Sequence, residues 1–360
     1  MSRIIAFYLP QFHPIKENNE WWGSGFTEWV NVAKARPLYK GHKEPHIPTD
    51  LGFYDLRVPE VREEQAKLAR EAGIEGFCYW HYWFAGRRLL ERPFNEVLAS
   101  GKPDFPFCLA WANHSWYKKL WDPNAPEKDK LLIEQTYPGV EDYVNHFNEL
   151  LPAFKDDRYI RVNGKLFFVI YDALHFDDIK TFINTWRKLA KENALNDFYF
   201  VATDADSRNK DIILSKGLDA IYNNDTFNVH HHLSKWKKGL LYFQRNYLKR
   251  PTVFDYKDAI KHMVIDDCKN KGVIPMIVPN WDHSPRSGAN AIILKNSTPD
   301  LFQQISERAI EIVKQKPEEE QIIILKSWNE WGEGNYMEPD MEFGHGYIEA
   351  LRKAIENKKK

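Results

Sequence analysis

The sequence contains few cysteines and no long apolar segment. Its 360 residues include three cysteines, Cys78, Cys108 and Cys268, an odd number without regular spacing. This count argues against a disulfide framework and a thiolate metal site, so we expect buried free thiols. No apolar run approaches the roughly 20 residues of a membrane-spanning helix. The first residues, MSRIIAFYLP, lack the hydrophobic region of a signal peptide, and we expect a cytoplasmic protein.

The sequence also lacks an excess of charge and a phosphate-binding loop. Fifty basic residues are balanced by 51 acidic ones, which leaves a net charge of -1. Such a balance gives no electrostatic basis for a nucleic-acid partner or an anionic membrane surface. No glycine-rich loop of the Rossmann or Walker type occurs, so the usual signature of a nucleotide site is missing. We therefore expect no cofactor.

Aromatic residues, in contrast, are abundant. They make up 14% of the chain, with 13 tryptophans, many of them beside polar residues. A sugar ring has an apolar C–H face and a rim of hydroxyls, which suits large rings next to hydrogen-bonding groups. The composition thus favours a carbohydrate ligand.

Short runs of β-branched and aromatic residues alternate with helical patterns, which is typical of βα units around a buried parallel sheet. Helical periodicity predicts helices over residues 59–72, 142–154, 177–193 and 299–316, and a last helix from near His345. Eight alternations predict an α/β fold, a single (β/α)8 TIM barrel over residues 1–360, with long loops after strand 1 (residues 10–59) and strand 6 (residues 226–252). The predicted strands are RIIAFYL from residue 3, GFCYWHY from 76, FPFCLAWAN from 105, LFFVIYDA from 166, FYFVATDA from 198, LDAIYNND from 218, VIPMIVPNW from 273 and QIIILKSW from 321.

Polar and aromatic side chains follow every predicted strand. In such barrels, sites are built at the carboxyl ends of the strands. One such residue is more often structural than functional, but eight strand ends in register favour a site. These strand-end candidates include Tyr8, His13, Tyr79, His81, Trp111, Asn113, Tyr171, Asp204, Asp206, Trp281 and Arg286.

Two glutamates follow the last predicted strand, in the stretch WNEWGEG. Glu330 and Glu333 could face one ligand only if the chain turns near them, and Gly332 and Gly334 permit that turn. Paired carboxylates are the usual means of cleaving a glycosidic bond. Their pKa values must then differ, through burial against nearby indoles and mutual repulsion. The motif alone leaves two solvated loop glutamates as an equal alternative.

The loop after strand 6 contains two further features. His230, His231 and His232 are adjacent, and adjacent side chains cannot all ligate one ion without distortion, so we predict no metal site. The following segment mixes basic and aromatic residues and could lie on a membrane or contact a partner. A lid over the barrel mouth is the favoured interpretation, because long barrel loops usually form sites.

Long motifs resemble a known family. They span Tyr8 to about Pro339 and resemble the WbsX-like group, which is related to glycoside hydrolase family 99. The motifs are the stretch from FYLPQFHP to GFYDLR near the amino terminus, then GFCYWHYWFAGRRLLERP, CLAWAN, PNWDHSPR and SWNEWGEGNYMEPD.

The resemblance implies a (β/α)8 barrel and, by analogy with family 99, metal-free, endo-acting cleavage of α-mannosides with retention. It implies that Glu330 assists the substrate's 2-hydroxyl in forming a 1,2-anhydro sugar, while Glu333 protonates the departing oxygen and later activates water. The group tends to carry a glutamate after WAN, where this chain has His114. Its members are commonly named glycosyltransferases of O-antigen and capsule synthesis, but two acids without a nucleotide signature favour a hydrolase.

We therefore predict a retaining endo-glycosidase that acts on a bacterial polysaccharide or oligosaccharide. The alternatives are a glycosyltransferase or transglycosylase that builds surface polysaccharide such as O-antigen, and a non-catalytic carbohydrate-binding barrel. The predicted catalytic residues are Glu330 and Glu333. The predicted sugar contacts are Tyr8, His13, Trp22, Glu28, Trp29, Tyr79, His81, Trp111, Asn113, Tyr171, Asp204, Trp281, Arg286, Trp328 and Asn329.

Overall fold

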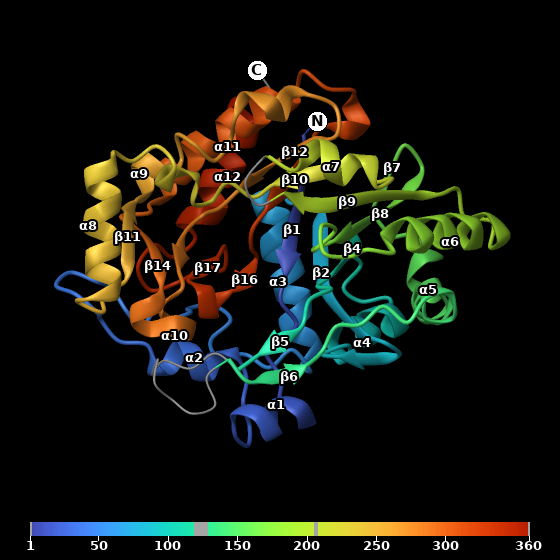
Figure 1. The fold of residues 1–360 in the computed structure, drawn as a ribbon, viewed down its shortest axis with the longest axis horizontal. Helices are drawn as coiled ribbons and strands as arrows, with labels where there is room; N and C mark the ends of the chain where they lie inside the picture. The colour runs from blue at the N-terminus through green and yellow to red at the C-terminus, as the bar shows by residue number, and fades with distance from the viewer. Residues whose placement is uncertain (1, 119–128, 205–207, 359–360) are drawn as a thin grey trace.

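Eight parallel strands close into a barrel in the computed structural model, which describes residues 2–118, 129–204 and 208–358 (Figure 1). Strand β1 pairs in parallel with both β2 and β15, which closes the sheet. The predicted (β/α)8 barrel is thus confirmed. Its strands, in chain order, are β1 (Arg3–Tyr8), β2 (Gly76–Phe84), β4 (Phe107–Trp111), β8 (Lys165–Ile170), β9 (Phe198–Asp204), β10 (Ala220–Asn223), β12 (Val273–Ile277) and β15 (Ile322–Leu325).

The strands are apolar on both faces because one face lines the barrel and the other packs against helices. Two neighbours on β1 illustrate the alternation. Phe7 stacks on Trp80 of β2, with ring centroids 4.6 Å apart. The Tyr8 hydroxyl instead donates to Gln65 at 2.6 Å, in the helix that follows β1. Successive residues of a strand therefore belong to different layers.

Helices surround the barrel close to the predicted positions (Figure 1). The clearest is α6, whose Phe182, Ile183 and Trp186 are buried against the sheet, as its periodicity predicts. Glycine ends α3, where Gly73 has a φ of +84° in the left-handed region. The outer helices are α3 (Pro59–Ala72), α4 (Arg92–Ser100), α5 (Val140–Phe154), α6 (Ile179–Glu192), α7 (Lys210–Ser215), α11 (Pro299–Val313) and α12 (Gly346–Asn357).

The long loops carry short elements of their own. The loop after β1 contains α1 (Lys16–Trp22) and α2 (Glu28–Lys34), and the loop after β10 contains α8 (Lys235–Asn246). A third insertion, which the sequence did not predict, follows β12. It contains β13 (Trp281–Asp282), α10 (Ser284–Ser287) and β14 (Ile292–Lys295), and β14 lies between β13 and β11 (Thr252–Asp255) in a small sheet.

Beyond β15 the chain folds back over the barrel mouth. Asn329 and Glu330 form β16, a turn of 3-10 helix covers Trp331–Glu333, and β17 (Asn335–Tyr336) pairs with β16. The Asn329 side chain accepts from the Leu9 amide at 2.8 Å and donates to the Leu9 carbonyl at 3.1 Å. It thereby continues the pairing of the first and last strands past their ends.

Two expectations from composition concern the chain as a whole. All three cysteines are buried and free, as predicted. Across the ranges that the structure describes, we find no helix with the length and apolar character needed to cross a bilayer.

Candidate active site

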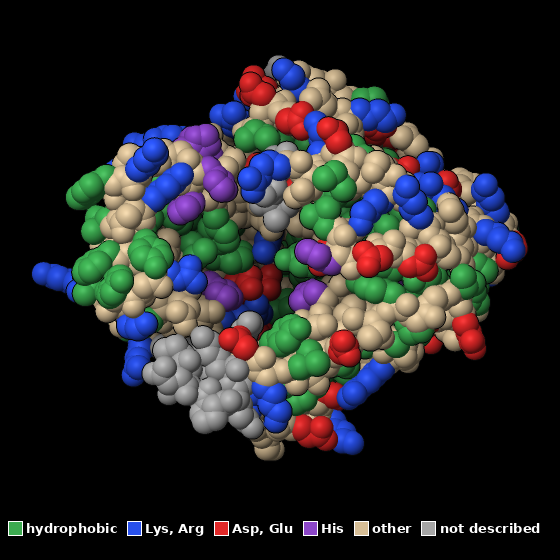
Figure 2. All heavy atoms as spheres, in the orientation of Figure 1, with side chains coloured by type: hydrophobic (Ala, Val, Ile, Leu, Met, Phe, Trp, Pro, Cys, Tyr) green, Lys and Arg blue, Asp and Glu red, His purple; other side chains and the backbone are tan. Residues whose placement is uncertain are grey.

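A cavity of about 810 Å³ opens at the mouth of the barrel. Figure 2 shows it as a hollow near the centre of the molecule, with acidic and histidine side chains at its walls. Loops after most of the barrel strands contribute to it, as the location of barrel sites predicts. Its lining residues include Gln11, Trp22, Glu28, Trp80, Tyr82, Asn113, His114, Trp116, Tyr117, Tyr171, Asp172, His283, Arg286, Lys326, Glu330 and Glu333.

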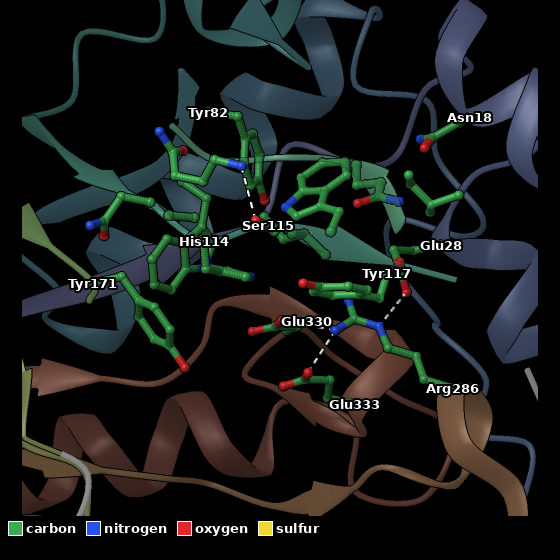
Figure 3. A pocket seen from close by; sticks show the side chains of 18 of the residues that line it. Asn18, Glu28, Tyr82, His114, Ser115, Tyr117, Tyr171, Arg286, Glu330 and Glu333 are labelled. Atoms are coloured by element: carbon green, nitrogen blue, oxygen red, sulfur yellow. Dashed lines mark hydrogen bonds and ion pairs between the residues drawn. The ribbon is translucent and has the colours of Figure 1, made fainter. Parts of the chain in front are cut away.

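Arg286 brings three carboxylates together on one wall of this cavity (Figure 3). Its Nη1 lies 2.6 Å from Glu333 Oε1 and 3.2 Å from Glu330 Oε1. Its Nε donates to Glu28 Oε2 at 3.1 Å. The guanidinium side chain is 22% exposed and reaches the carboxylates from α10, whereas Glu28 opens α2. Three segments that are distant in sequence therefore meet at one charge.

The turn between the two glutamates is possible because of its glycines. A Cβ on Gly332 would lie 1.9 Å from Glu28 Oε2, so a larger residue would collide with the carboxylate that Arg286 holds. Gly334 has a φ of +52°, and a Cβ there would lie 2.7 Å from the Asp282 side chain. The turn expected from the glycines is thus present, and Gly332 serves close approach rather than unusual backbone angles.

The two glutamates have opposite pKa directions. Burial, and then repulsion from Glu333, raise the pKa of Glu330, although Arg286 and Lys326 act against them. Burial also acts to raise the pKa of Glu333, but the positive charge of Arg286, with smaller contributions from His283 and Lys326, outweighs it and lowers that pKa well below its usual range. At neutral pH Glu333 is therefore anionic, and Glu330 is the carboxyl that takes up a proton more readily.

Two basic residues that the sequence did not single out also face Glu333. His283 Nε2 lies 3.5 Å from Glu333 Oε1, and Lys326 Nζ lies 4.0 Å from Oε2. Lys326 Nζ also lies 4.5 Å from the centre of the Trp281 ring. His283 could have been predicted from the sequence as a site residue, because it lies between the predicted residues Trp281 and Arg286. Lys326 follows a strand directly, where a lysine is too common to be a signal.

Seven of the predicted site residues line the cavity: Trp22, Glu28, Asn113, Tyr171, Arg286, Glu330 and Glu333. Asn113 is held on both sides of its amide. Its Nδ2 donates to the Tyr137 hydroxyl and the Asp172 carbonyl, at 2.9 and 2.8 Å, and its Oδ1 accepts from the Asp172 amide at 2.7 Å. Next to it, burial lowers the pKa of His114, so this ring faces the cavity in its neutral form.

Ten predicted residues are buried in the protein and do not line this cavity. Several have polar groups with partners inside the fold: Trp29 Nε1 donates to the Tyr54 carbonyl at 2.7 Å, and His13 Nδ1 lies 3.0 Å from the Pro10 carbonyl oxygen. Trp281 lies behind Lys326. Asp206, also expected at a strand end, lies outside the described residues. The ten are Tyr8, His13, Trp29, Tyr79, His81, Trp111, Asp204, Trp281, Trp328 and Asn329.

Strand alternation explains why two predicted residues of β2 do not line the cavity. Tyr79 and His81 of β2 point into the helix layer, where His81 Nε2 lies 2.8 Å from Nε2 of His146 on α5. The neighbouring residues on β2, Trp80 and Tyr82, line the cavity instead. Because both faces of a barrel strand are covered, hydrophobicity does not reveal which face points inward. The strand was predicted correctly, but the wrong face was assigned to the site.

The loop after β10 does not form the predicted lid. None of residues 226–252 lines the cavity, and α8 lies at the flank of the molecule next to β11 (Figure 1). The indoles expected to bury the glutamates are also placed differently. Trp331 stacks on Tyr336, with centroids 3.7 Å apart, and donates to Glu338 at 2.6 Å.

A buried group of ligand-type side chains lies outside the cavity. His42, Glu44 and Asp282 place one ligand atom each within 4.8 Å of one another, the one such group among the residues that the structure describes. The Leu38 amide donates to His42 Nδ1 at 3.0 Å, so the ring proton is on Nε2, which lies 2.6 Å from Asp282 Oδ2. A metal on Nε2 would require that proton on Nδ1, facing the Leu38 N–H. The group therefore fits a hydrogen-bonded network that ties the first loop to Asp282, beside Gly334.

Comparisons of sequence and structure agree with this architecture. A model of the family described as Glycosyltransferase WbsX matches residues 4–351. Proteins named WxcX from two strains of Xanthomonas campestris pv. campestris are 32% and 31% identical to this chain over 98% of its length. The chain spans about half of these relatives, 50% of their length.

Solved structures of glycoside hydrolases share the fold. A glycoside hydrolase-like protein has a TM-score of 0.61 at 15% identity, with 98% of this chain and 93% of the other covered. The GH99 endo-alpha-mannosidase from Bacteroides thetaiotaomicron has a TM-score of 0.58 at 14% identity, with 99% and 97% covered. At such identities, the likeness concerns the barrel alone.

Proposed function

This chain belongs to the glycosyltransferase WbsX family, and we propose that it is a carbohydrate-active enzyme that hydrolyses an α-linked, manno-type glycosidic bond within a bacterial polysaccharide or oligosaccharide. The observation that carries the proposal is the pair Glu330 and Glu333, two carboxylates on one guanidinium nitrogen at the wall of the cavity. Two carboxyl groups whose surroundings separate their pKa values are suited to acid and base roles at one acetal.

The cavity wall supports a sugar ligand. Its volume of about 810 Å³ leaves space for more than one sugar ring, which supports an endo-acting enzyme. Trp22, Trp80 and Trp116 offer ring faces for the apolar side of a pyranose, while His114 and Asp172 offer groups for its hydroxyls. The manno-type substrate rests on the name of the GH99 structural neighbour. His114 lies where the family resemblance implies a glutamate, so this residue can give the chain a different sugar specificity.

The chemical step needs one proton donor and one base. In the reaction that the family resemblance implies, the 2-hydroxyl oxygen of the sugar attacks C1, its proton passes to a carboxylate, the C1–O bond to the departing sugar breaks, and that oxygen takes a proton from the other carboxyl group. Water then attacks C1 and gives a proton to the carboxylate that had donated one, the C1–O2 bond breaks, and O2 takes back its proton from the other carboxyl group, which gives overall retention. All atoms and protons are accounted for by the substrate, water and two glutamates.

The pKa directions of the two glutamates bear on which of them donates the proton. The resemblance assigns the donor role to Glu333, but Arg286 holds the pKa of Glu333 low. Burial raises the pKa of Glu330, which favours it as the carrier of the proton before substrate enters. Donation by Glu333 requires that a bound sugar weaken its contact with Arg286. We propose that Glu330 and Glu333 act as the pair and that Glu330 is protonated first.

A glycan screen tests the hydrolase proposal. Purified protein is incubated with α-linked manno-oligosaccharides and bacterial polysaccharides, and reducing ends are measured. Replacing either catalytic glutamate by glutamine should lower the rate at least about 10²-fold. Glu320→Gln is the matched control, because Glu320 is buried but does not line the cavity. Equal rates in all variants, or no product from any glycan with folded protein, would refute the proposal.

The family's name favours a second candidate, a glycosyltransferase or transglycosylase that builds surface polysaccharide. A transferase needs an activated donor, so calorimetry with nucleoside diphosphate sugars separates the two functions. Tight binding of such a donor and sugar transfer to an acceptor would favour the transferase. Glycan binding without any product would leave a carbohydrate-binding barrel.

A further inference from the structure

The flank of the molecule carries an exposed apolar face on α8 (Lys235–Asn246). No residue of this helix is buried, although the helix contains tryptophan, tyrosine, phenylalanine and two leucines. Figure 2 shows hydrophobic and basic side chains together at this edge, where Figure 1 places α8. The residues Trp236, Leu240, Phe243 and Tyr247 are 75, 40, 49 and 68% exposed.

These four side chains form one stripe. They follow one another at intervals of four, three and four residues, the spacing that keeps side chains on one face of a helix. Phe243 and Tyr247 stack, with ring centroids 5.2 Å apart. Leu241, which falls on a different face, is partly buried against the core. The helix is thus attached through Leu241, and the stripe points to solvent.

The same segment carries positive charge only. Six lysines and arginines lie between Ser234 and Pro251, and no acidic residue occurs between Asp225 and Asp255. On α8 itself, Lys235 and Lys237 flank Trp236, and Arg245 lies in the last turn. The chain as a whole has a net charge of -1, so the local excess is a property of this segment.

We propose that α8 docks this protein on the surface of an anionic lipid bilayer. A basic helix with exposed tryptophan, leucine and phenylalanine on one side is suited to the boundary between headgroups and acyl chains, where rings enter and lysines meet phosphates. Charge complementarity selects this occupant over a second copy of the chain, because two copies of the same basic segment would repel each other. None of the residues of α8 lines the cavity.

Vesicle co-sedimentation tests the proposal with the full chain. The probes are vesicles of phosphatidylcholine alone and vesicles with about 30% phosphatidylglycerol, an anionic content high enough to attract basic segments. We expect binding to the anionic vesicles to be at least about tenfold stronger, with each charge near the surface contributing roughly fivefold, and to weaken as salt is raised. Binding of equal strength to both vesicles would overturn the proposal.

Two variants locate the surface. Trp236→Ser/Phe243→Ser removes the rings from the stripe, and Lys235→Gln/Lys237→Gln removes charge from its border. Each should lower binding at least about fivefold, while circular dichroism stays unchanged, because the substituted side chains are exposed. Lys188→Gln/Lys353→Gln, which alters exposed lysines on α6 and α12, is the matched control and should bind as the wild type does.

The remaining outcomes are also decisive. Equal loss in the control pair would show general charge attraction and overturn a specific role for α8. Wild-type protein that ignores vesicles but sediments as a dimer, and becomes monomeric in Trp236→Ser/Phe243→Ser, would identify a second copy as the occupant and overturn the bilayer. Glycan cleavage is measured separately, so failure here is distinguishable from failure of the hydrolase proposal.

Discussion

Arg286→Gln should destabilise the protein in a manner that depends strongly on pH. The substitution removes the one guanidinium that contacts Glu28, Glu330 and Glu333, at 3.1, 3.2 and 2.6 Å. Unit charges about 4 Å apart interact with roughly 4 kcal/mol at an effective dielectric constant of 20. Removing one partner of a buried pair typically costs about 3–5 kcal/mol, because the remaining charge stays buried. We expect a loss in this range at pH 8.

The direction of the pH effect follows from the pKa of Glu333. In the wild type this pKa is lowered from 4.5, so its contribution to stability is present above pH 4.5 and is lost only as the pH falls below that value. Without Arg286, only the weaker effects of His283 and Lys326 oppose the burial of Glu333, so we expect its pKa to rise above 4.5 and the variant to lose stability as the pH rises. The difference in free energy of unfolding should therefore shrink by at least about 1.4 kcal/mol between pH 8 and pH 5, the value of one pKa unit.

Urea unfolding followed by tryptophan fluorescence measures this difference at several pH values. Arg158→Gln is the matched control, because Arg158 is also mostly buried but pairs with a single carboxylate, Asp156. Arg158 lowers the pKa of Asp156, and without it that pKa should return to about 3.8, still below pH 5. The control difference should thus stay constant from pH 5 to 8. A constant difference for Arg286→Gln as well would refute the idea that one guanidinium neutralises three carboxylates.

Three further perturbations have defined outcomes. Because the pKa of Glu330 is raised, we expect Glu330 to be the proton donor, so Glu330→Gln should retain more of its rate on an aryl glycoside with a good leaving group than on a natural glycan. Glu333→Gln should lose at least about 10²-fold on both substrates, and the reverse pattern in steady-state kinetics would make Glu333 the donor. Burial raises the pKa of Glu44 to about 9, so its contribution to the free energy of unfolding falls as the pH rises above 4.5. Between pH 5 and 8, Glu44→Gln should lose at least about 1.4 kcal/mol less free energy of unfolding than the wild type, as measured by urea unfolding. Parallel curves of free energy against pH for the two proteins would contradict this. Gly332→Ala should cost about 1–3 kcal/mol and lower activity, because its Cβ would overlap a carboxylate, whereas Gly239→Ala, which meets open space, should be neutral or stabilising in the same assay.

The barrel was predictable from sequence because its strands are continuous apolar runs that alternate with helical patterns, as expected for parallel strands buried on both faces. All eight strands overlap predicted segments, although β2 ends two residues later and β8 begins one residue earlier than predicted, and the helix over Pro59–Ala72 has the predicted ends. The third insertion was missed because β13 and β14 have only two and four residues. Runs this short carry no reliable periodicity.

The site was predictable in its chemistry but only partly in its geometry. The glutamates and Arg286 were identified from residue type and position at strand ends. That Arg286 contacts Glu28 as well depends on a chain separation of 258 residues, which no local pattern encodes. The choice between Tyr79 and Trp80 depends on strand orientation, and both faces of β2 are apolar and aromatic. The basic and aromatic composition of the α8 segment was evident from the sequence, but the exposure of its aromatic side chains was not.

The seam between β1 and β15 links the integrity of the fold to its chemistry. Residues Arg3 to Ala6 pair with Ile322 to Leu325. The side-chain amide of Asn329, the residue directly before Glu330, extends this pairing to Leu9. The segment that contains Asn329 and Glu330 therefore both helps to close the barrel and places a carboxyl group at the barrel mouth. If the proposed glycan cleavage is measured as the temperature rises, its loss should coincide with faster hydrogen exchange of the Leu9 amide. Turnover would then report whether the pairing of the first and last strands is intact.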